Sequence, residues 1–230
     1  MSQLPRTIDF ASVLASTVHD MKNSLCMLIQ SAELIQQESN QLSEPAKDEL
    51  ARLNYEANRL NSNLLQLLSL YRLERNQLPV QIDEHYLSDV IEEVLLKNEY
   101  FSQQRKVSVS VEQQINLCWF FDYDLIINLL NDAVANALRY CKQHIVLQVS
   151  NDNNSLVIEV HDDGKGFPDF MLQHDAMDMN SPDMANNHTG LGIFFAKLIA
   201  SAHSNKGQAG KVTLSNGGRF GGGVFQLTLP

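Results

Sequence analysis

The sequence of 230 residues predicts a helical hairpin over residues 1–78, followed by a two-layer α/β sandwich over residues 79–230. Three observations carry this prediction. In two stretches of the first third, apolar residues alternate at intervals of four and three, as in helices that pack along a seam. This alternation ends at Leu78-Pro79. Beyond that point, segments of period two and of helical period follow one another, which is typical of layered sheets and helices.

Two long helices are expected in the first third. Their seam residues are Leu14, Val18, Met21, Leu25, Leu28, Ala32 and Ile35 in the first helix, and Ala46, Leu50, Leu53, Ala57, Leu60, Leu64, Leu67 and Tyr71 in the second. Pro45 suits the first turn of the second helix. Because two helices leave part of each seam uncovered, we expect two chains to form a homodimer with a four-helix bundle. The alternative is a hairpin that folds back on its own C-terminal half.

The remainder of the chain alternates between strand and helix patterns. Strands are expected at 80–82, 107–111, 117–121, 144–149, 156–160, 212–214 and 224–229, and helices at 87–101, 124–140 and 191–202. The polar run 151–154 between two of the strands is typical of a tight turn. Hairpins mixed with helices favour one sheet covered by helices.

The composition excludes several classes of protein. With 44% hydrophobic and 19% charged residues, it is that of an ordinary soluble globular protein. No apolar run approaches the roughly 20 residues that span a bilayer, and residues 1–10 lack a signal-peptide pattern, so we expect a cytoplasmic chain without a membrane partner. The net charge of -10 argues against a nucleic-acid partner. Cys26, Cys118 and Cys141 lie in apolar patterns and are expected to be reduced.

His19 lies on the first expected helix, outside the apolar seam. With Val18 in the seam, the heptad places His19, Asp20 and Asn23 on the polar side. An exposed imidazole nitrogen can act as a nucleophile, and a neighbouring carboxylate can hold the proton of the other ring nitrogen. On these residues alone, the simpler interpretation is a surface histidine beside a surface aspartate.

A second group of residues follows the expected strand at 156–160. Gly164 and Gly166 permit a tight turn and a close approach of the backbone to a ligand. The carboxylate of Asp162 can accept a hydrogen bond from an exocyclic amine. Further along, Gly190 and Gly192 open a helix, where free backbone N–H groups favour phosphate.

The helix at 124–140 carries a third group. Asp132 and Asn136 are four residues apart and share one face. The amide oxygen of Asn136, together with water and phosphate oxygens, would suit Mg²⁺, and the positive charge of Arg139 would suit a phosphate. In isolation, a solvated helix face explains these residues equally well.

Taken together, these segments resemble the catalytic core of sensor histidine kinases. The matching segments are His19-Asp20-Met21-Lys22-Asn23-Ser24-Leu25 (H-box), Asn136-Ala137-Leu138-Arg139-Tyr140 (end of the N-box), Asp162-Asp163-Gly164-Lys165-Gly166 (G1 box), Gly190-Leu191-Gly192-Ile193 (G2 box) and the closing strand 222–230. The resemblance covers nearly the whole chain, in order. It implies a dimerisation and histidine-phosphotransfer hairpin, followed by an ATP-binding domain of the type shared with DNA gyrase and MutL.

The resemblance also implies roles for individual residues. His19 would take the γ-phosphoryl group of ATP and pass it to an aspartate of a response regulator receiver domain, with Asp20 assisting deprotonation. Asn23 would orient water if the chain also dephosphorylates the regulator. Asn136 would ligand Mg²⁺, and Asp162 would recognise adenine. The rest of the implied nucleotide site is Asp132, Arg139, Tyr140, Gly164, Gly166, Gly190, Leu191 and Gly192.

The chain departs from the family pattern at several positions. Ser24 replaces a frequent proline, Asp132 a frequent asparagine and His188 a usual glycine, and residues 168–189 contain no Lys or Arg. The acidic segment 168–189 and His188 favour an alternative: a histidine phosphotransfer protein or phosphatase scaffold whose ATP-binding domain has little or no kinase turnover. A serine/threonine kinase of the anti-sigma type, on a related fold, would have no use for an exposed His19.

The signal input is not apparent in this chain. Fewer than 20 residues precede His19, so we expect either a piece of a longer protein or a separate sensor protein that docks on it. Phosphorylation within one subunit or between two subunits depends on the handedness of the hairpin segment 36–44, and both remain open.

Overall fold

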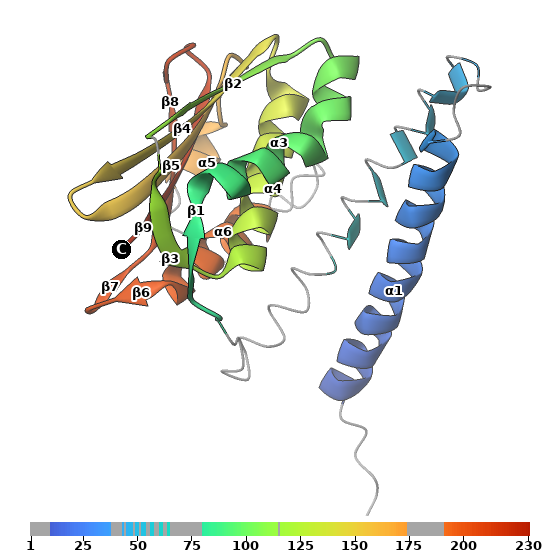
Figure 1. Cartoon of the computed structure of the whole chain (residues 1–230), viewed down its shortest axis with the longest axis horizontal. Helices are drawn as coiled ribbons and strands as arrows, with labels where there is room; N and C mark the ends of the chain where they lie inside the picture. Colours follow the sequence, from blue (N-terminus) through green and yellow to red (C-terminus); the bar gives the residue numbers. More distant parts are fainter. Residues whose placement is uncertain are drawn as a thin grey trace, which may run out of the picture. The chain divides into compact units, whose positions relative to one another are not determined.

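The structure is a computed structural model in which residues 10–37, 80–114, 116–173 and 191–230 are described, together with residues 43, 45–47, 49–50, 52–53, 56–57, 60–61 and 64. The chain divides into two compact units, Met1–Pro79 and Val80–Pro230. Figure 1 shows the long helix of the first unit and the layered sheet and helices of the second.

The first unit contains helix α1, Phe10–Gln37, where the first long helix was expected. Helical backbone recurs at the described positions between 45 and 64, and the rest of the second expected helix, up to Tyr71, lies outside the described residues. The expected seam is divided into two rows. One row is buried: Val18, Leu25, Ala32 and Ala57. The other row is at least half exposed: Met21, Leu28, Ile35, Leu53 and Leu60.

The second unit is built on a five-stranded mixed sheet in the order β2-β4-β5-β9-β8. Its strands are β2 (Ser108–Gln113), β4 (His144–Asp152), β5 (Ser155–Asp162), β8 (Lys211–Asn216) and β9 (Gly223–Leu229). Strands β2 and β4 are parallel, and the other neighbours are antiparallel. The parallel pair requires a long crossover, which strand β3 (Cys118–Phe121) and the helix after it provide.

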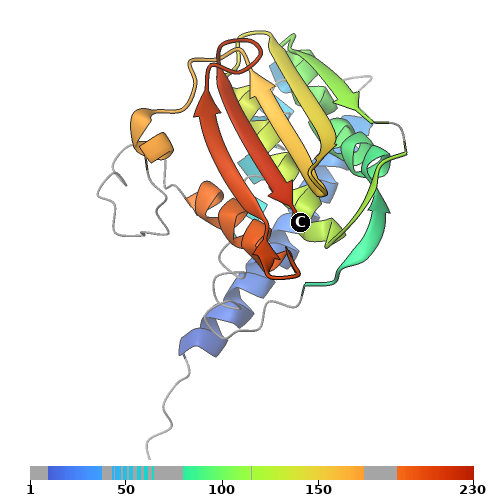
Figure 2. The same ribbon diagram turned by 90° about the vertical axis from the view of Figure 1, so that its left-hand side faces the viewer.

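The helices of this unit are α3 (Leu87–Gln104), α4 (Tyr123–Tyr140), the short α5 (Asp169–Gln173) and α6 (Leu191–Ala202). Figure 2 shows the sheet in front, with α3, α4 and α6 behind it. Between these layers lies the core, which includes Leu130 of α4, Leu147 of β4 and Ile158 of β5. Burying such a side chain stabilises the fold by about 1.5–3 kcal/mol. The predicted α/β sandwich is therefore confirmed for this unit.

The strand predicted at 80–82 is wrong. The strand in this region is β1, Asp83–Tyr86, and it pairs antiparallel with β3 from Asp83 opposite Phe121 onward. The backbone N–H of Gln81 instead donates to the carboxylate of Asp122 over 2.9 Å. Apolar Val80 and Ile82 misled the prediction, because the strand boundaries are set by pairing with a distant strand that the local pattern does not show.

Two turns show how local chemistry ends the strands. Asn153 and Asn154 have φ angles of 48° and 63° and join β4 to β5, which confirms the expected turn, since asparagine tolerates this conformation. A small hairpin of β6 (Ser204–Asn205) and β7 (Gln208–Ala209) was not predicted. Gly207, with φ of 82°, allows its tight reversal.

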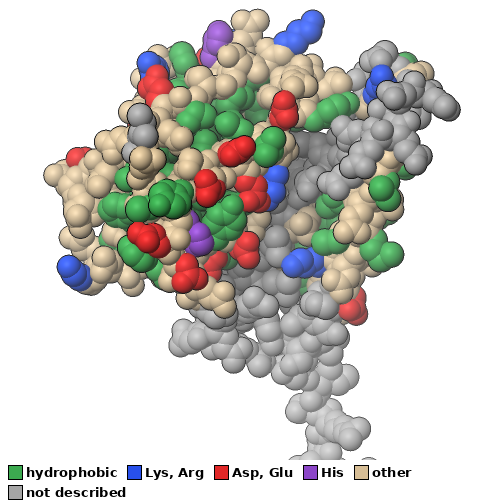
Figure 3. Space-filling view, viewed as in Figure 1, with side chains coloured by type: hydrophobic (Ala, Val, Ile, Leu, Met, Phe, Trp, Pro, Cys, Tyr) green, Lys and Arg blue, Asp and Glu red, His purple; other side chains and the backbone are tan. Residues whose placement is uncertain are grey.

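All three cysteines are free thiols, as expected. Burial raises the pKa of the Cys141 thiol, which keeps it protonated and unreactive. None of the helices within the described ranges is both long and apolar enough to cross a membrane. Figure 3 shows acidic side chains gathered on one face, in keeping with the net charge of -10.

Candidate nucleotide site and histidine-bearing helix

Asp162 is the last residue of β5, and only 7% of it is exposed. Its Oδ1 atom accepts hydrogen bonds from the backbone N–H of Gly164 over 2.7 Å and of Gly223 over 3.3 Å. The hydrogen bonds described for this carboxylate all use Oδ1, so Oδ2 could still accept one. One oxygen is thus fixed by the protein, and the other can receive an amine.

The glycines around Asp162 leave no room for a side chain. A Cβ atom on Gly164 would lie 2.5 Å from the carbonyl oxygen of Tyr140, and one on Gly222 would lie 2.6 Å from Oδ1 of Asp162. Gly166 has a φ of 80°, a left-handed conformation that favours glycine. These residues bring the turn after β5, the end of α4 and the start of β9 into contact.

Asp163 fastens the turn after β5 to the segment that follows α4. Its carboxylate accepts the backbone N–H of Lys142 over 2.7 Å and that of Gln143 over 3.0 Å. Burial alone would raise the pKa of Asp163, but hydrogen bonds from these backbone groups outweigh it and hold the pKa below its usual value. This contribution to stability is present above the unfolded pKa and is lost as the pH falls through the folded one.

The final turns of α4 carry the predicted polar row beside this turn. Asp132 is half-buried, and Asn136, Arg139 and Tyr140 are exposed. The guanidinium carbon of Arg139 lies 5.7 Å from the centre of the Tyr140 ring, a cation–π distance. Because the carbonyl of Tyr140 contacts the Gly164 position, the row ends directly beside Asp162.

The start of α4 and the end of α6 are joined by two buried residues, Asp122 and His203. Asp122 caps α4, accepting the backbone N–H of Leu125 over 3.0 Å, and its own backbone N–H donates to Nε2 of His203 over 3.0 Å. Nδ1 of His203 lies 2.7 Å from the carbonyl oxygen of Ile199, so the neutral ring carries its proton on Nδ1. Burial lowers the pKa of His203 and favours this neutral form.

The remaining predicted residues are divided between two helices. Gly192 is exposed in the first turn of α6, while Gly190 and the side chain of Leu191 lie outside the described residues, as does His188. On α1, Asp20 and Asn23 are exposed, and the side chain of His19 is outside the description although its backbone is helical. The structure therefore brings together Asp162, its glycines and the end of α4.

Sequence reasoning gave no role to four residues at this site: Asp163, Asn216, Gly222 and Gly223. The side chain of Asn216 accepts the backbone N–H of Phe167 over 2.7 Å and donates to the carbonyl of Phe167 over 2.8 Å. Asn216 is followed by two glycines, which signals a turn but gives no sign that the turn returns to the end of β5.

Similarities to known proteins agree with this geometry. Residues 121–230 match the family of histidine kinase-, DNA gyrase B-, and HSP90-like ATPases. The chain is 24% identical over 227 residues to the sensor protein KdpD of Clostridium acetobutylicum, covering 96% of this chain and 24% of that protein. It is 24% identical over 214 residues to the sensor protein SrrB of Staphylococcus aureus, covering 87% and 36%. The chain thus spans about a quarter to a third of the length of these relatives.

Solved structures show the same fold. The histidine kinase AdeS of Acinetobacter baumannii has a TM-score of 0.59 at 18% identity, covering 92% of this chain and 96% of that one. Full-length ShkA in complex with AMPPNP has a TM-score of 0.63 at 16% identity, covering 96% and 46%. Residues 121–230 are therefore similar to histidine kinase-, DNA gyrase B- and HSP90-like ATPases, and the chain as a whole resembles the catalytic core of a sensor histidine kinase, as its motifs predicted.

Proposed function

We propose that this chain phosphorylates His19 with ATP and passes the phosphoryl group to an aspartate of a response regulator receiver domain. The observation that carries the proposal is Asp162, a nearly buried carboxylate with Oδ1 fixed by backbone N–H groups and Oδ2 left for an amine. The exocyclic amine of adenine is such a donor. The relatives named sensor proteins, which match most of this chain, support the same conclusion.

The residues present fit ATP with Mg²⁺. The backbone at Gly164 and Gly222 packs too closely against Tyr140 and Asp162 for a side chain, and this packing holds the Asp162 carboxylate in place. Asn136 presents an exposed amide oxygen, and Mg²⁺ is commonly held by one or two protein oxygens together with water and phosphate. Within the ranges described, no three His, Cys, Asp or Glu side chains gather to hold a metal by themselves. This suits a metal that is held jointly with a nucleotide.

ATP supplies the phosphoryl group for this reaction. A neutral ring nitrogen of His19 forms the new N–P bond as the bond between the γ-phosphorus and its bridging oxygen breaks, and ADP leaves. Asp20, the next residue, would hold the proton on the other ring nitrogen. In the second step, the N–P bond breaks as a carboxylate oxygen of the regulator bonds to phosphorus, which restores the neutral imidazole.

We also propose that two chains pair through the first unit. The row of Met21, Leu28, Ile35, Leu53 and Leu60 is 50–59% exposed within one chain. It forms one side of a heptad seam, and a second copy of the same seam would cover it. A four-helix bundle buries such rows from both chains.

A scaffold with little kinase turnover is the second candidate. It is favoured by segment 168–189, which contains Asp169, Asp175, Asp178 and Asp183 but no Lys or Arg. A cation is a common means of stabilising charge during phosphoryl transfer. Because the segment has no Lys or Arg, that role would fall to Mg²⁺, to backbone groups, or to Lys165 and Arg139.

Incubation with Mg²⁺ and γ-labelled ATP tests the leading proposal. We expect protein-bound label that is stable in alkali and lost in acid, because an N–P bond of histidine hydrolyses in acid whereas phosphoserine survives it. Asn136→Ala should need more Mg²⁺ to reach the same label if Asn136 holds the metal. Acid-stable label would contradict the proposal. Nucleotide binding without any label would favour the scaffold.

Regulator dephosphorylation tests the proposed role of Asn23, an exposed residue one helical turn after His19. Asn23→Ala is expected to slow the decay of a phosphorylated regulator about tenfold or more while sparing autophosphorylation, because only the first reaction requires a positioned water. The decay is followed with a regulator purified in its phosphorylated form. Equal decay rates with parent and variant would remove this role.

A further inference from the structure

We infer that the turn 217–222, between β8 and β9, is a positioning element for Asp162, and that an ion pair between Arg219 and Glu112 holds this turn in place. The inference rests on the proposed role of Asp162 in nucleotide recognition. Arg219 and Glu112 would then be positioning residues that act on nucleotide selectivity through Asp162, without contacting the nucleotide.

The base of the turn touches Asp162 directly. Gly223, which follows the turn, donates its backbone N–H to Oδ1 of Asp162 over 3.3 Å. Gly222 approaches so closely that an added Cβ would lie 2.6 Å from Oδ1 and 2.7 Å from the backbone nitrogen of Gly164. Any shift of these two glycines therefore changes the surroundings of the carboxylate.

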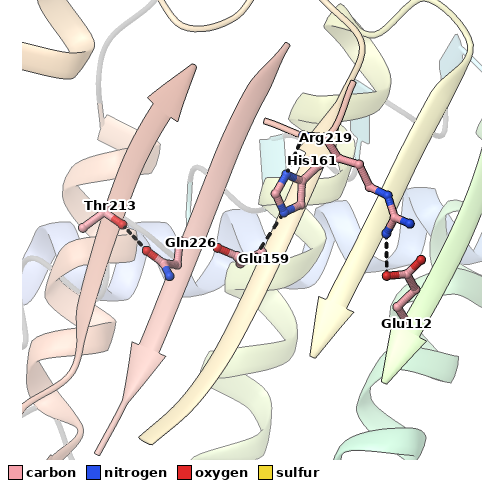
Figure 4. Close-up of polar contacts among 6 residues, drawn as sticks. All are labelled: Glu112, Glu159, His161, Thr213, Arg219 and Gln226. Carbon is pink, nitrogen blue, oxygen red and sulfur yellow. Dashed lines mark hydrogen bonds and ion pairs between the residues drawn. The ribbon is translucent and has the colours of Figure 1, made fainter. Parts of the chain in front are cut away.

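The tip of the turn is held from the other side. The guanidinium of Arg219 lies 2.5 Å from Oε2 of Glu112 on β2, although strands β4 and β5 separate β2 from β9. Figure 4 shows this side chain extended from the turn toward Glu112. The ring of Phe220 lies 5.8 Å from the ring of His144 at the start of β4. The tip thus contacts the far edge of the sheet.

His161, the residue before Asp162, completes the support. Its Nδ1 accepts the backbone N–H of Arg219 over 3.5 Å, and its Nε2 lies 3.3 Å from Oε2 of Glu159 (Figure 4). Gly218 packs against the same ring, with a would-be Cβ 2.7 Å from Nδ1. Strand β5 therefore presents Asp162 on the core side and His161 on the opposite side, and the turn and Gly223 contact both residues.

The internal bonds of the turn make it move as a unit. Gly217 donates its N–H to the carbonyl of Gly222 over 2.9 Å, and Gly221 donates to that of Gly218 over 2.8 Å. Displacing the tip therefore displaces the base. The bond from Gly223 to Asp162, at 3.3 Å, is longer than the usual 2.9–3.0 Å and would be lost first. A carboxylate whose Oδ1 is held by Gly164 alone would present Oδ2 less consistently to a ligand amine.

The test compares ADP with GDP, because guanine has a carbonyl oxygen where adenine has the exocyclic amine. Arg219→Gln and Glu112→Gln are each expected to weaken the binding of ADP about three- to fivefold, which is the effect of losing one half-exposed ion pair. The affinity for GDP should stay unchanged. Arg219→Lys, which keeps the positive charge, should bind ADP more tightly than Arg219→Gln but less tightly than the parent. The matched control is Lys211→Gln, which removes an exposed cation from the opposite end of β8. Dissociation constants come from calorimetry on the full chain.

The double variant Arg219→Gln with Glu112→Gln is expected to bind ADP no more weakly than either single one, since both changes remove the same contact. ADP affinity equal to that of the parent in both single variants would overturn the inference, as would equal weakening of ADP and GDP. Failure of the proposed function is distinct: the parent chain itself would then bind ADP no more tightly than GDP.

Discussion

Replacing His19 with alanine is expected to abolish acid-labile label while leaving the affinity for ADP within twofold of the parent. The reason is that His19 and the nucleotide site belong to different units of the chain. The proposed nucleophile belongs to α1 in the first unit, whereas Asp162, Gly164 and the end of α4 belong to the second. Removing the imidazole deletes the proposed phosphoryl acceptor and should leave the nucleotide site intact. Autoradiography and calorimetry on the same preparations measure the two properties.

Two further variants distinguish the loss of the phosphoryl acceptor from misfolding of the helix. His19→Gln keeps a polar side chain on the helix and should also carry no label. Gln30→Ala changes an exposed residue of the same helix and should be labelled like the parent. Label retained by both His19 variants would place the acceptor elsewhere. Joint loss of label and ADP binding would show that α1 contributes to the nucleotide site.

Replacing Asp122 with alanine is expected to destabilise the second unit by about 2–4 kcal/mol, since it removes a helix cap and leaves a partly buried N–H without its acceptor. Its Oδ1 caps α4 at Leu125, and its Oδ2 accepts the N–H of Gln81, where the chain enters this unit. Trp119, the single tryptophan, lies on β3 three residues away and reports the unfolding of this unit in urea.

Asp124→Ala is the matched control, because Asp124 is an exposed acid in the first turn of the same helix. Its loss removes only the interaction with the helix dipole, which is worth about 0.3–1 kcal/mol. The Asp122 variant should also lower the protection of the Gln81 amide from hydrogen exchange. An equal effect of the two substitutions on the free energy of unfolding would show that Asp122 acts only as a charge near the helix start, and that its hydrogen bonds to Leu125 and Gln81 add no stability.

Local patterns were sufficient where a single element determines its own residues. Helix α6 spans Leu191–Ala202 as predicted, and Asn153 and Asn154 form the expected turn, because helical period and left-handed conformation are properties of the local chain. The strand predicted at 80–82 failed for the opposite reason. The position of β1 depends on pairing with β3, more than 30 residues away, and no local pattern contains that partner.

The same distinction applies to the nucleotide site. Asp162, Gly164 and Gly166 could be predicted because one turn after one strand holds them, and their spacing in the sequence is their spacing in space. Asp163, Asn216, Gly222 and Gly223 could not, because each acts on a segment distant in the sequence. Gly222 and Gly223, for example, reach Asp162 only once β9 lies beside β5.

The sequence by itself determined the order of the motifs, the helical character of α1, the layered α/β class of the second unit and the carboxylate at the end of β5. Short-range periodicity and backbone preference suffice for all of these. Only the tertiary structure decided which oxygen of Asp162 is fixed, and that Arg219 reaches Glu112 across the sheet. It also decided that His203 ties the end of α6 to the start of α4. These contacts join residues many positions apart, and chain folding alone selects such pairs.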